Sequence, residues 1–362
     1  MRRLEEGGCR VALQARGERV RVRGVIKKRG SAMKRLAHRL PILILIGLMG
    51  SFLSTVYRVG GQTGELGILE YARECAERIA TVPPFDCTAG TVAQITVNGE
   101  APEQYLPHMS CDRPALLPYG EESDGQCVPY SRALVLRDDD KVQISAFCRQ
   151  KLIRPADTYL YDEIDVILHS VETGSTCWFE ATIENPNRDP AMGLDGRRVP
   201  SPSQDSPSTR SFWDPPAKTA SKECGTCHDS DPFYYSPYVA QTGQLPADPF
   251  GKYANDIGAP FQAWTRPRSL STRGNTCTGC HRIGSLHTCQ IGIFQSIGER
   301  EIKDLDERGK TYPYSHWMPV DNLWTKEQWD VIYLQAVAQL SQCCKAPETP
   351  GCISTPIQGS PP

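Results

Sequence analysis

Residues 132–148 read RALVLRDDDKVQISAFC, two β-type runs on either side of a charged turn. Within each run apolar side chains recur at about every second position, the period of a strand with one buried face. The intervening RDDDK predicts a hairpin turn. A cation site at Asp138–Asp140 is the alternative, and a solvated turn is favoured over it. This stretch therefore predicts antiparallel β structure.

Comparable runs flank this hairpin on both sides. They are TVAQITV (91–97), EIDVILHSV (163–171) and TCWFEATI (176–183). Turn residues separate them, as in a meander of short strands. We expect a small antiparallel β domain here, stapled by disulfides.

Two further segments have the period of a helix. In the first, residues 64–82, one face carries Ile68, Ala72, Cys75 and Ile79, and Pro83-Pro84 should end the helix. The second follows Thr325 and Gln328, which form a capping box. Its apolar face carries Trp329, Ile332, Tyr333, Ala336 and Leu340.

Composition limits the class of protein. The chain has 362 residues, enough for two domains of ordinary size, and a formal net charge of −2. No basic balance points to nucleic acid, so we expect no nucleic-acid partner. The 15 cysteines favour an oxidising compartment over a reducing cytosol.

The N-terminal region predicts export. Met33 opens a short basic stretch, and an apolar run follows from Leu40 to Leu53. That run fits the h-region of a signal peptide better than a membrane span of about 20 residues. The segment after Leu53 is a poor cleavage site, so an uncleaved anchor in the inner membrane stays open. We expect a periplasmic or secreted protein, with residues 1–58 forming an N-terminal extension plus signal or anchor.

Two pentapeptides carry the chemistry: CGTCH at Cys224–His228 and CTGCH at Cys277–His281. C-x-x-C-H is the pattern of c-type haem attachment. Two thiols three positions apart reach the two vinyl groups on one porphyrin edge, and the following imidazole binds the iron. The predicted cofactors are two covalently attached haem c groups. They would be held by Cys224, Cys227, His228, Cys277, Cys280 and His281, with His228 and His281 as iron ligands.

Other uses of paired cysteines fit less well. In a zinc ribbon the two C-x-x-C pairs usually lie about 15–20 residues apart, but 49 residues lie between Cys227 and Cys277. Zinc also gives no reason for a histidine after both pairs. A redox dithiol needs a βαβ context that is not visible here, and disulfides would tolerate any following residue.

The remaining cysteines predict a disulfide framework. Cys9 precedes the signal segment, and ten cysteines are left once the four in the motifs are set aside. Ten allow five bridges, whose connectivity the sequence does not give. Cys289 is expected to pair with one of Cys343, Cys344 or Cys352.

Each iron needs a candidate for its sixth position. Met318, held on an extended segment by Pro319 and followed by the C-terminal helix, suits one iron; a buried core methionine is the alternative. His287 and His316 compete for the other; for each, an ordinary surface or hydrogen-bonding histidine is the alternative. His287 lies six residues past His281, too close to reach the far face of the same haem easily, so it could serve the haem at Cys224–His228.

The stretch SHWMPVDNLWTKEQWDVIYLQAVAQL (315–340) resembles class I cytochrome c, in which a Met-Pro loop precedes a helix that packs on the haem-bearing helix. For the segment from Cys277 to about Cys343, the resemblance implies His281 as proximal ligand and Met318 as distal ligand. The segment CGTCHDSDPFYYSPYVAQ (224–241) is also similar to predicted secreted dihaem cytochromes with an N-terminal cysteine-rich domain. That likeness implies architecture and little mechanism.

The resulting fold class is multidomain α and β: a disulfide-rich antiparallel β domain followed by a mainly α-helical, cytochrome c-like dihaem domain. The expected boundaries are 62–183 for the β domain, 184–220 for a Pro/Ser-rich linker or wrapping arm, 221–346 for the dihaem domain and 347–362 for a flexible tail, which Cys352 could tie down.

Three functions are consistent with these features. The first is one-electron transfer to or from a redox partner protein or a small electron donor or acceptor. The second is a dihaem redox enzyme, such as a peroxidase, with one open iron. The third is a binding module in which the β domain recognises a polysaccharide, metal or protein. The sequence favours a carrier over a catalyst and assigns no catalytic residue.

Overall fold

The computed structural model describes residues 67–97, 100–107, 109, 111, 127–183, 189–233, 237–246, 248, 250–266, 268–289, 293 and 326–359. The N-terminal apolar run, His316, Met318 and the capping residue Thr325 lie outside these ranges, so the expectations for them remain predictions. Within the ranges, no helix is both long enough and apolar enough to cross a membrane.

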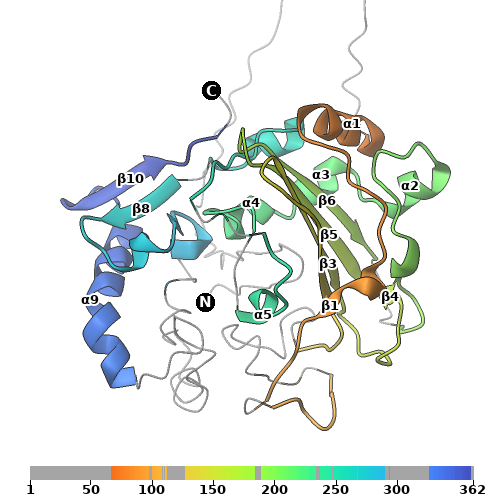
Figure 1. The fold of residues 1–362 in the computed structure, drawn as a ribbon, viewed down its shortest axis with the longest axis horizontal. Coiled ribbons are helices and arrows are strands. Elements are labelled where there is room, and N and C mark those ends of the chain that lie inside the picture. The colour runs from red at the N-terminus through yellow and green to blue at the C-terminus, as the bar shows by residue number, and fades with distance from the viewer. Residues whose placement is uncertain are drawn as a thin grey trace, which may run out of the picture. The chain divides into compact units, whose positions relative to one another are not determined.

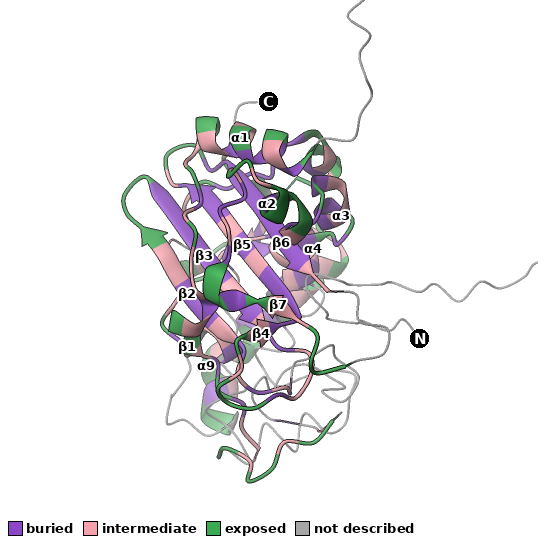
Figure 2. Cartoon of the chain, turned by 90° about the vertical axis from the view of Figure 1, so that its right-hand side faces the viewer, coloured by how far each residue is buried: buried purple, intermediate pink, exposed green. Residues whose placement is uncertain are grey.

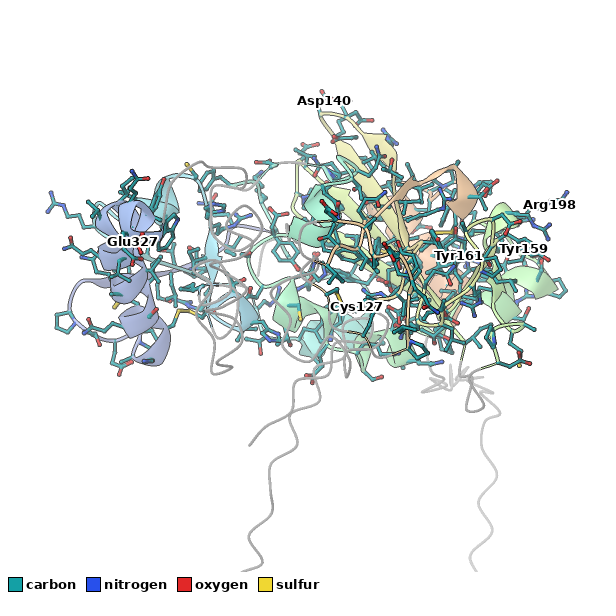
Figure 3. All side chains as sticks on the ribbon, turned by 90° about the horizontal axis from the view of Figure 1, so that it is seen from below. Cys127, Asp140, Tyr159, Tyr161, Arg198 and Glu327 are labelled. Atoms are coloured by element: carbon teal, nitrogen blue, oxygen red, sulfur yellow. A yellow bond between two sulfur atoms is a disulfide. The ribbon has the colours of Figure 1, made fainter. Side chains whose placement is uncertain are left out.

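The predicted meander is present as a five-stranded antiparallel sheet of order β1-β2-β3-β5-β6 (Figure 1). Its strands are β1 (Thr91–Val92), β2 (Arg132–Asp138), β3 (Val142–Arg149), β5 (Glu163–Ser170) and β6 (Thr176–Thr182). The charged turn between β2 and β3 is closed by the Asp139 carboxylate, which accepts the backbone N–H groups of Lys141 and Val142. Asp140 projects from this end of the sheet (Figure 3). The antiparallel β expectation is therefore correct.

The first helix predicted from the sequence is α1 (Ile68–Arg78), which packs against one face of the sheet. Ile164 and Leu168 of β5 share a buried apolar core with Tyr71 of α1. A disulfide joins Cys75 of α1 to Cys177 of β6. Figure 2 shows buried residues along β3, β5 and β6. The helix ends five residues before Pro83, so the prolines do not set its last turn.

The Pro/Ser-rich segment after the sheet forms short elements that pack against it. These are β7 (Leu194–Asp195), which pairs with β4 (Leu160–Tyr161), and the helices α2 (Pro207–Phe212) and α3 (Pro216–Ala220). Trp213 is buried beside Phe179 of β6, and the Thr182 hydroxyl donates to Asp214 at 2.6 Å. Burial of Trp213 gives this segment the energetic reason to wrap around the sheet rather than extend from it.

The second half of the chain is not mainly α-helical in the residues that the structure describes, so the expected cytochrome c-like fold is wrong. It contains a second antiparallel sheet of order β10-β8-β9, built from β8 (Arg268–Thr272), β9 (Ile283–Gly284) and β10 (Cys352–Pro356). Between residues 237 and 289 the described helices, α5 (Pro237–Ala240), η3 (Ala259–Ala263) and η4 (Cys277–Gly279), have at most five residues. Gly258, directly before η3, and Gly274, after β8, adopt positive φ angles, which lie outside the right-handed helical region.

The C-terminal helix is the one long helix described in this half. α9 (Lys326–Lys345) buries Trp329, Ala336 and Leu340 as its period predicted, whereas Ile332 is exposed. The residues after it were expected to be flexible. Instead, residues 352–356 form β10, because the Cys343–Cys352 disulfide ties them to α9 and β8 supplies backbone hydrogen bonds.

Five disulfides take up all ten cysteines outside the two C-x-x-C-H motifs and Cys9, as the arithmetic predicted. The pairs are Cys75–Cys177, Cys87–Cys148, Cys111–Cys127, Cys289–Cys344 and Cys343–Cys352. The prediction that Cys289 pairs with Cys343, Cys344 or Cys352 is thus confirmed. A framework of this density indicates an oxidising environment, extracellular or periplasmic.

Candidate functional site

The first motif forms one helical turn, α4 (Cys224–Cys227), between α3 and the loop that begins at His228. The backbone N–H of His228 donates to the Cys224 carbonyl at 2.9 Å, which closes the turn. Cys224 is buried in the core beneath the main sheet, and Cys227 and His228 are half-buried. Both cysteines are thiols, outside the five bridges.

The His228 ring is oriented by its surroundings. Its Nδ1–H donates to the Pro232 carbonyl at 2.9 Å, which leaves Nε2 as the nitrogen that can bind a metal. The ring lies 5.0 Å from the Trp178 ring of β6, centroid to centroid. The Tyr253 hydroxyl donates to the His228 carbonyl at 2.5 Å. An imidazole fixed through Nδ1 is the arrangement that metal-ligating histidines usually show.

The turn of the first motif lies close to two aromatic side chains and an amide. The Trp178 indole N–H donates to Asn255 Oδ1 at 3.0 Å, and the Trp264 indole N–H donates to the Ala220 carbonyl at 2.9 Å. A Cβ at Gly225 would meet the Trp264 ring at 2.7 Å and Asn255 at 3.0 Å. Glycine at the first x position of this motif is therefore required by packing, which the pattern C-x-x-C-H does not disclose.

The second motif begins on a single 3₁₀ turn, η4, rather than on a helix. The His281 N–H donates to the Cys277 carbonyl at 2.9 Å, the same closure as in the first motif. Asn275 anchors the turn, because its side chain accepts the Cys277 N–H at 3.0 Å and donates to the Ala336 carbonyl of α9 at 2.9 Å. Cys280 and His281 are exposed, while Cys277 is half-buried and desolvation raises the pKa of its thiol.

Arg282, next to His281, joins the second motif to the loop after the first. Its guanidinium donates to the Ser230 carbonyl at 2.6 Å and to the Gly251 carbonyl at 2.5 Å, and lies 3.4 Å from the Asp231 carboxylate. The Arg282 side chain is only 10% exposed. Desolvation raises the pKa of Asp231 to about 6, and the nearby Arg282 opposes that rise.

Asp229 makes a second connection between the same two loops. Its carboxylate is fully buried and accepts hydrogen bonds from the Leu286 N–H and from the N–H and hydroxyl of Thr288. Desolvation raises the pKa of Asp229 to about 6, while these hydrogen bonds lower it. A side chain at Gly284 would collide with this carboxylate. We call these contacts of residues 229–231 with residues 282–288 the inter-motif clamp.

The clamp brings a histidine of the second loop to the first motif. His287 Nδ1 lies 3.1 Å from Cys227 Sγ, across 60 residues of sequence. His287 is buried, with 5% of its surface exposed. Of the three candidates for a sixth iron ligand, it is the one that lies within the described residues, and it lies at the first motif.

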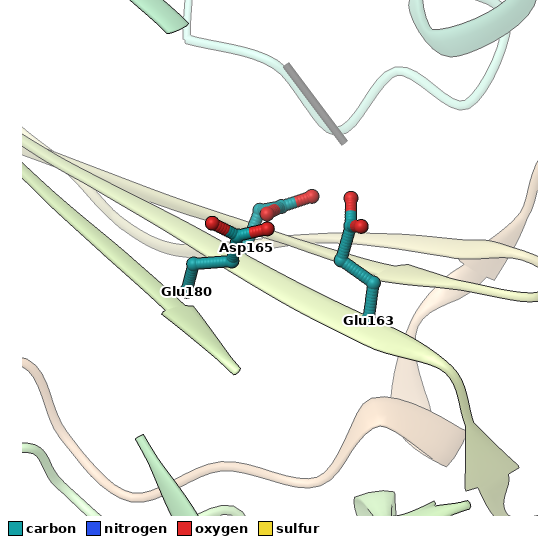
Figure 4. A group of neighbouring side chains, drawn as sticks. All are labelled: Glu163, Asp165 and Glu180. Carbon is teal, nitrogen blue, oxygen red and sulfur yellow. The ribbon is translucent and has the colours of Figure 1, made fainter. Parts of the chain in front are cut away.

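A zinc-like cluster is not formed at either motif by the described residues. Among the described residues, one group has three candidate ligand atoms within 4.8 Å of one another. It consists of Glu163, Asp165 and Glu180, on β5 and β6 of the main sheet (Figure 4). Three cations balance its charge. Lys151 Nζ lies 2.7 Å from Glu163, Lys222 Nζ lies 3.3 Å from Glu180, and the Arg149 guanidinium lies 3.2 Å from Glu163 and 3.9 Å from Asp165. The cluster is thus part of a buried ion-pair network on the sheet.

The sequence predicted the motif residues but missed those that hold them together. Asp229, Asp231 and Arg282 are the main cases. Their signal was available: acidic residues directly follow the first C-x-x-C-H and an arginine directly follows the second. Opposite charges next to two equivalent motifs can indicate that the motifs contact each other.

Comparison of the chain with protein-family models, with curated proteins and with solved structures gave no match. The functional class therefore rests on the two motifs, their geometry and the disulfide framework.

Proposed function

We propose that this chain is an exported carrier of two covalently attached c-type haems that transfers electrons one at a time. The observation that carries the proposal is the division of the cysteines. Ten form five disulfides, and the four in the C-x-x-C-H motifs stay thiols. In an oxidising compartment, two dithiol turns that each precede a histidine are best explained by haem attachment.

The residues present fit this cofactor. Cys224 and Cys227 would form thioethers at the first motif, and His228, held through Nδ1, would bind iron through Nε2. Cys277, Cys280 and His281 would play the same roles at the second motif. Haem iron supplies the one-electron chemistry. The residues of the two motifs would position both groups.

The inter-motif clamp supports electron transfer between the two sites. Ser230 lies two residues after His228, and Arg282 directly follows His281, so their 2.6 Å hydrogen bond ties the two ligand-bearing loops together. Two groups held by adjacent loops would exchange electrons rapidly. The partner would be a redox protein or a small electron donor or acceptor.

Sixth ligands and location complete the proposal. Met318 is the proposed sixth ligand of the second haem. His287 or His316 is that of the first, and the position of His287 beside Cys227 favours it over His316. The segment from Met33 would direct export to the periplasm or beyond, and would anchor the chain in the inner membrane if it is not cleaved.

The test is the haem content of the full chain, produced in a bacterium that attaches haem c in its periplasm. We expect two covalent haems per chain by pyridine haemochrome and mass. The double variant Cys224→Ser/Cys227→Ser should retain one, and the matched variant Cys111→Ser/Cys127→Ser, which loses only a disulfide, should retain two. Wild-type protein without covalent haem would contradict the proposal.

Spectra with carbon monoxide distinguish the carrier from the dihaem enzyme. Two low-spin, six-coordinate irons that do not bind carbon monoxide are expected of a carrier. A high-spin iron that binds the added ligand would favour a peroxidase-like enzyme with an open site.

A further inference from the structure

The C-terminal helix α9 exposes apolar side chains that its packing does not use. Val331 is 89% exposed, Ile332 43% and Leu334 41%. Single exposed apolar residues are ordinary on a protein surface. Three within four consecutive positions form a patch, and exposed apolar patches mark interaction sites.

The outer face of α1 shows what a solvated helix of this chain looks like. Every exposed residue of α1 is charged: Glu70, Arg73, Glu77 and Arg78. In α9, by contrast, residues 331–344 contain no charged side chain. A helix that faces only water usually carries charged or polar residues on its outer side. The outer face of α9 therefore has the composition of a contact surface.

One line of exposed side chains runs the length of α9. It consists of Glu327, Val331, Leu334, Ala338, Gln342 and Lys345, which we call the α9 stripe. At 3.6 residues per turn, these six positions lie within about a quarter of a turn of one another. The stripe is acidic at its start, where Figure 3 labels Glu327, and basic at its end. Its middle is apolar.

The α9 stripe is complementary to a reversed copy of itself. Leu334 and Ala338 lie two positions on either side of residue 336. Glu327 and Lys345 lie nine positions on either side of it. A two-fold axis beside residue 336 therefore sets a large side chain against a small one, and a carboxylate against an ammonium group, in two equivalent places. A parallel pair would oppose like charges and align the two helix dipoles unfavourably.

We propose that this chain forms a two-fold homodimer through antiparallel pairing of its α9 helices. The inference needs no haem and goes beyond the proposed function. Glu327 also has a contact within its own chain, but a carboxylate accepts several bonds and can bind Lys345 of the second copy as well. α9 has 20 residues and is about 30 Å long. An interface along one such helix lies at the low end of protein interfaces, below about 1,200 Å² in total, so the dimer forms at raised concentration and is transient.

The first measurement is sedimentation velocity of the full chain over a wide range of concentrations. Non-reducing electrophoresis excludes copies joined by a disulfide. Wild type should shift from monomer to dimer as the concentration rises. Leu334→Glu places two carboxylates in the apolar middle of the interface and should remove the dimer at every concentration. Because Leu334 is already 41% exposed, the monomer should keep its circular dichroism and urea midpoint.

The second measurement reverses the charges at the ends of the α9 stripe. Glu327→Lys and Lys345→Glu each oppose like charges in both equivalent places, and each should raise the dissociation constant about tenfold. An equal mixture of the two variants should recover the wild-type dissociation constant, because every lysine then faces a glutamate. A loss of helix stability could not produce this recovery, since both reversals oppose the helix dipole and mixing does not relieve it. Arg73→Glu, the matched reversal on α1, should leave the dimer unchanged.

The outcomes decide the proposal. A dimer that is lost in Leu334→Glu, weakened by each charge reversal and regained on mixing is the required result. A chain that stays monomeric at every concentration would overturn the proposal. So would a dimer of wild-type affinity in Leu334→Glu, or one that does not recover on mixing, because another surface would then hold the two copies together.

Discussion

His169, on the sheet face that carries the first motif, should make folding stability depend on pH. The residue is 3% exposed, and its Nδ1 lies 3.0 Å from the Thr176 hydroxyl. Its ring is edge-on to those of Phe233 and Tyr253. Desolvation, aided by the charge of Arg282, lowers the pKa of His169 from 6.5 to about 4.

The sign follows from proton linkage. Because the folded state binds this proton less tightly than the unfolded state, the stability from a neutral His169 is complete above a pH of about 6.5. It is lost as the pH falls toward the folded pKa of about 4. With these two pKa values, the free energy of unfolding should fall by about 2 kcal/mol between about pH 7.5 and pH 5 through this residue.

The assay is urea unfolding of wild type and His169→Gln at both pH values. The comparison must be between variants, because Asp229 and Asp231, whose pKa values are raised to about 6, change stability in the opposite direction as the pH falls. His169→Gln should lack the 2 kcal/mol component, whereas Thr176→Ser, which retains the hydroxyl partner, should keep it. Equal pH dependence in wild type and His169→Gln would refute the reasoning.

Further predictions concern the bridges and the clamp. Removing the Cys75–Cys177 disulfide should lower the free energy of unfolding by about 4 kcal/mol, because the Cys87–Cys148 bridge inside it shortens the loop that it closes in the unfolded chain. Removing Cys111–Cys127, with a separation of 16, should lower it by about 3 kcal/mol. Equal losses in urea titrations would contradict this chain-entropy argument. Arg282→Gln leaves the buried Asp231 without its cation and should cost about 3 kcal/mol, and Arg282→Lys less; an unchanged urea midpoint in Arg282→Gln would show that the clamp contributes nothing.

Local features of the fold were predictable because they depend on near neighbours in the chain. The alternation in residues 132–148 predicted β2, β3 and the turn between them, and the period of residues 326–345 predicted α9. The number of disulfides followed from counting cysteines outside the motifs. Their pairing did not, because a bridge such as Cys87–Cys148 depends on which strands become neighbours.

The prediction of a mainly α-helical second half failed for a related reason. The resemblance to class I cytochrome c rested on one motif and one helix, and both are compatible with other surroundings. What forms around Cys277 is a 3₁₀ turn beside a small sheet, and β10 joins that sheet from residues expected to be flexible. A short strand with few apolar residues has almost no signal of its own, since its stability comes from the strand it pairs with.

By itself the sequence determined the two C-x-x-C-H motifs, the oxidising compartment implied by its cysteines, and the antiparallel sheet. These depend on residue type and spacing over a few positions. Only the tertiary structure decided that residues 229–231 and 282–288 clamp the motifs together and that His287 lies beside Cys227. Such contacts join residues more than 50 positions apart, so they exist only once burial and backbone pairing have brought distant segments into register.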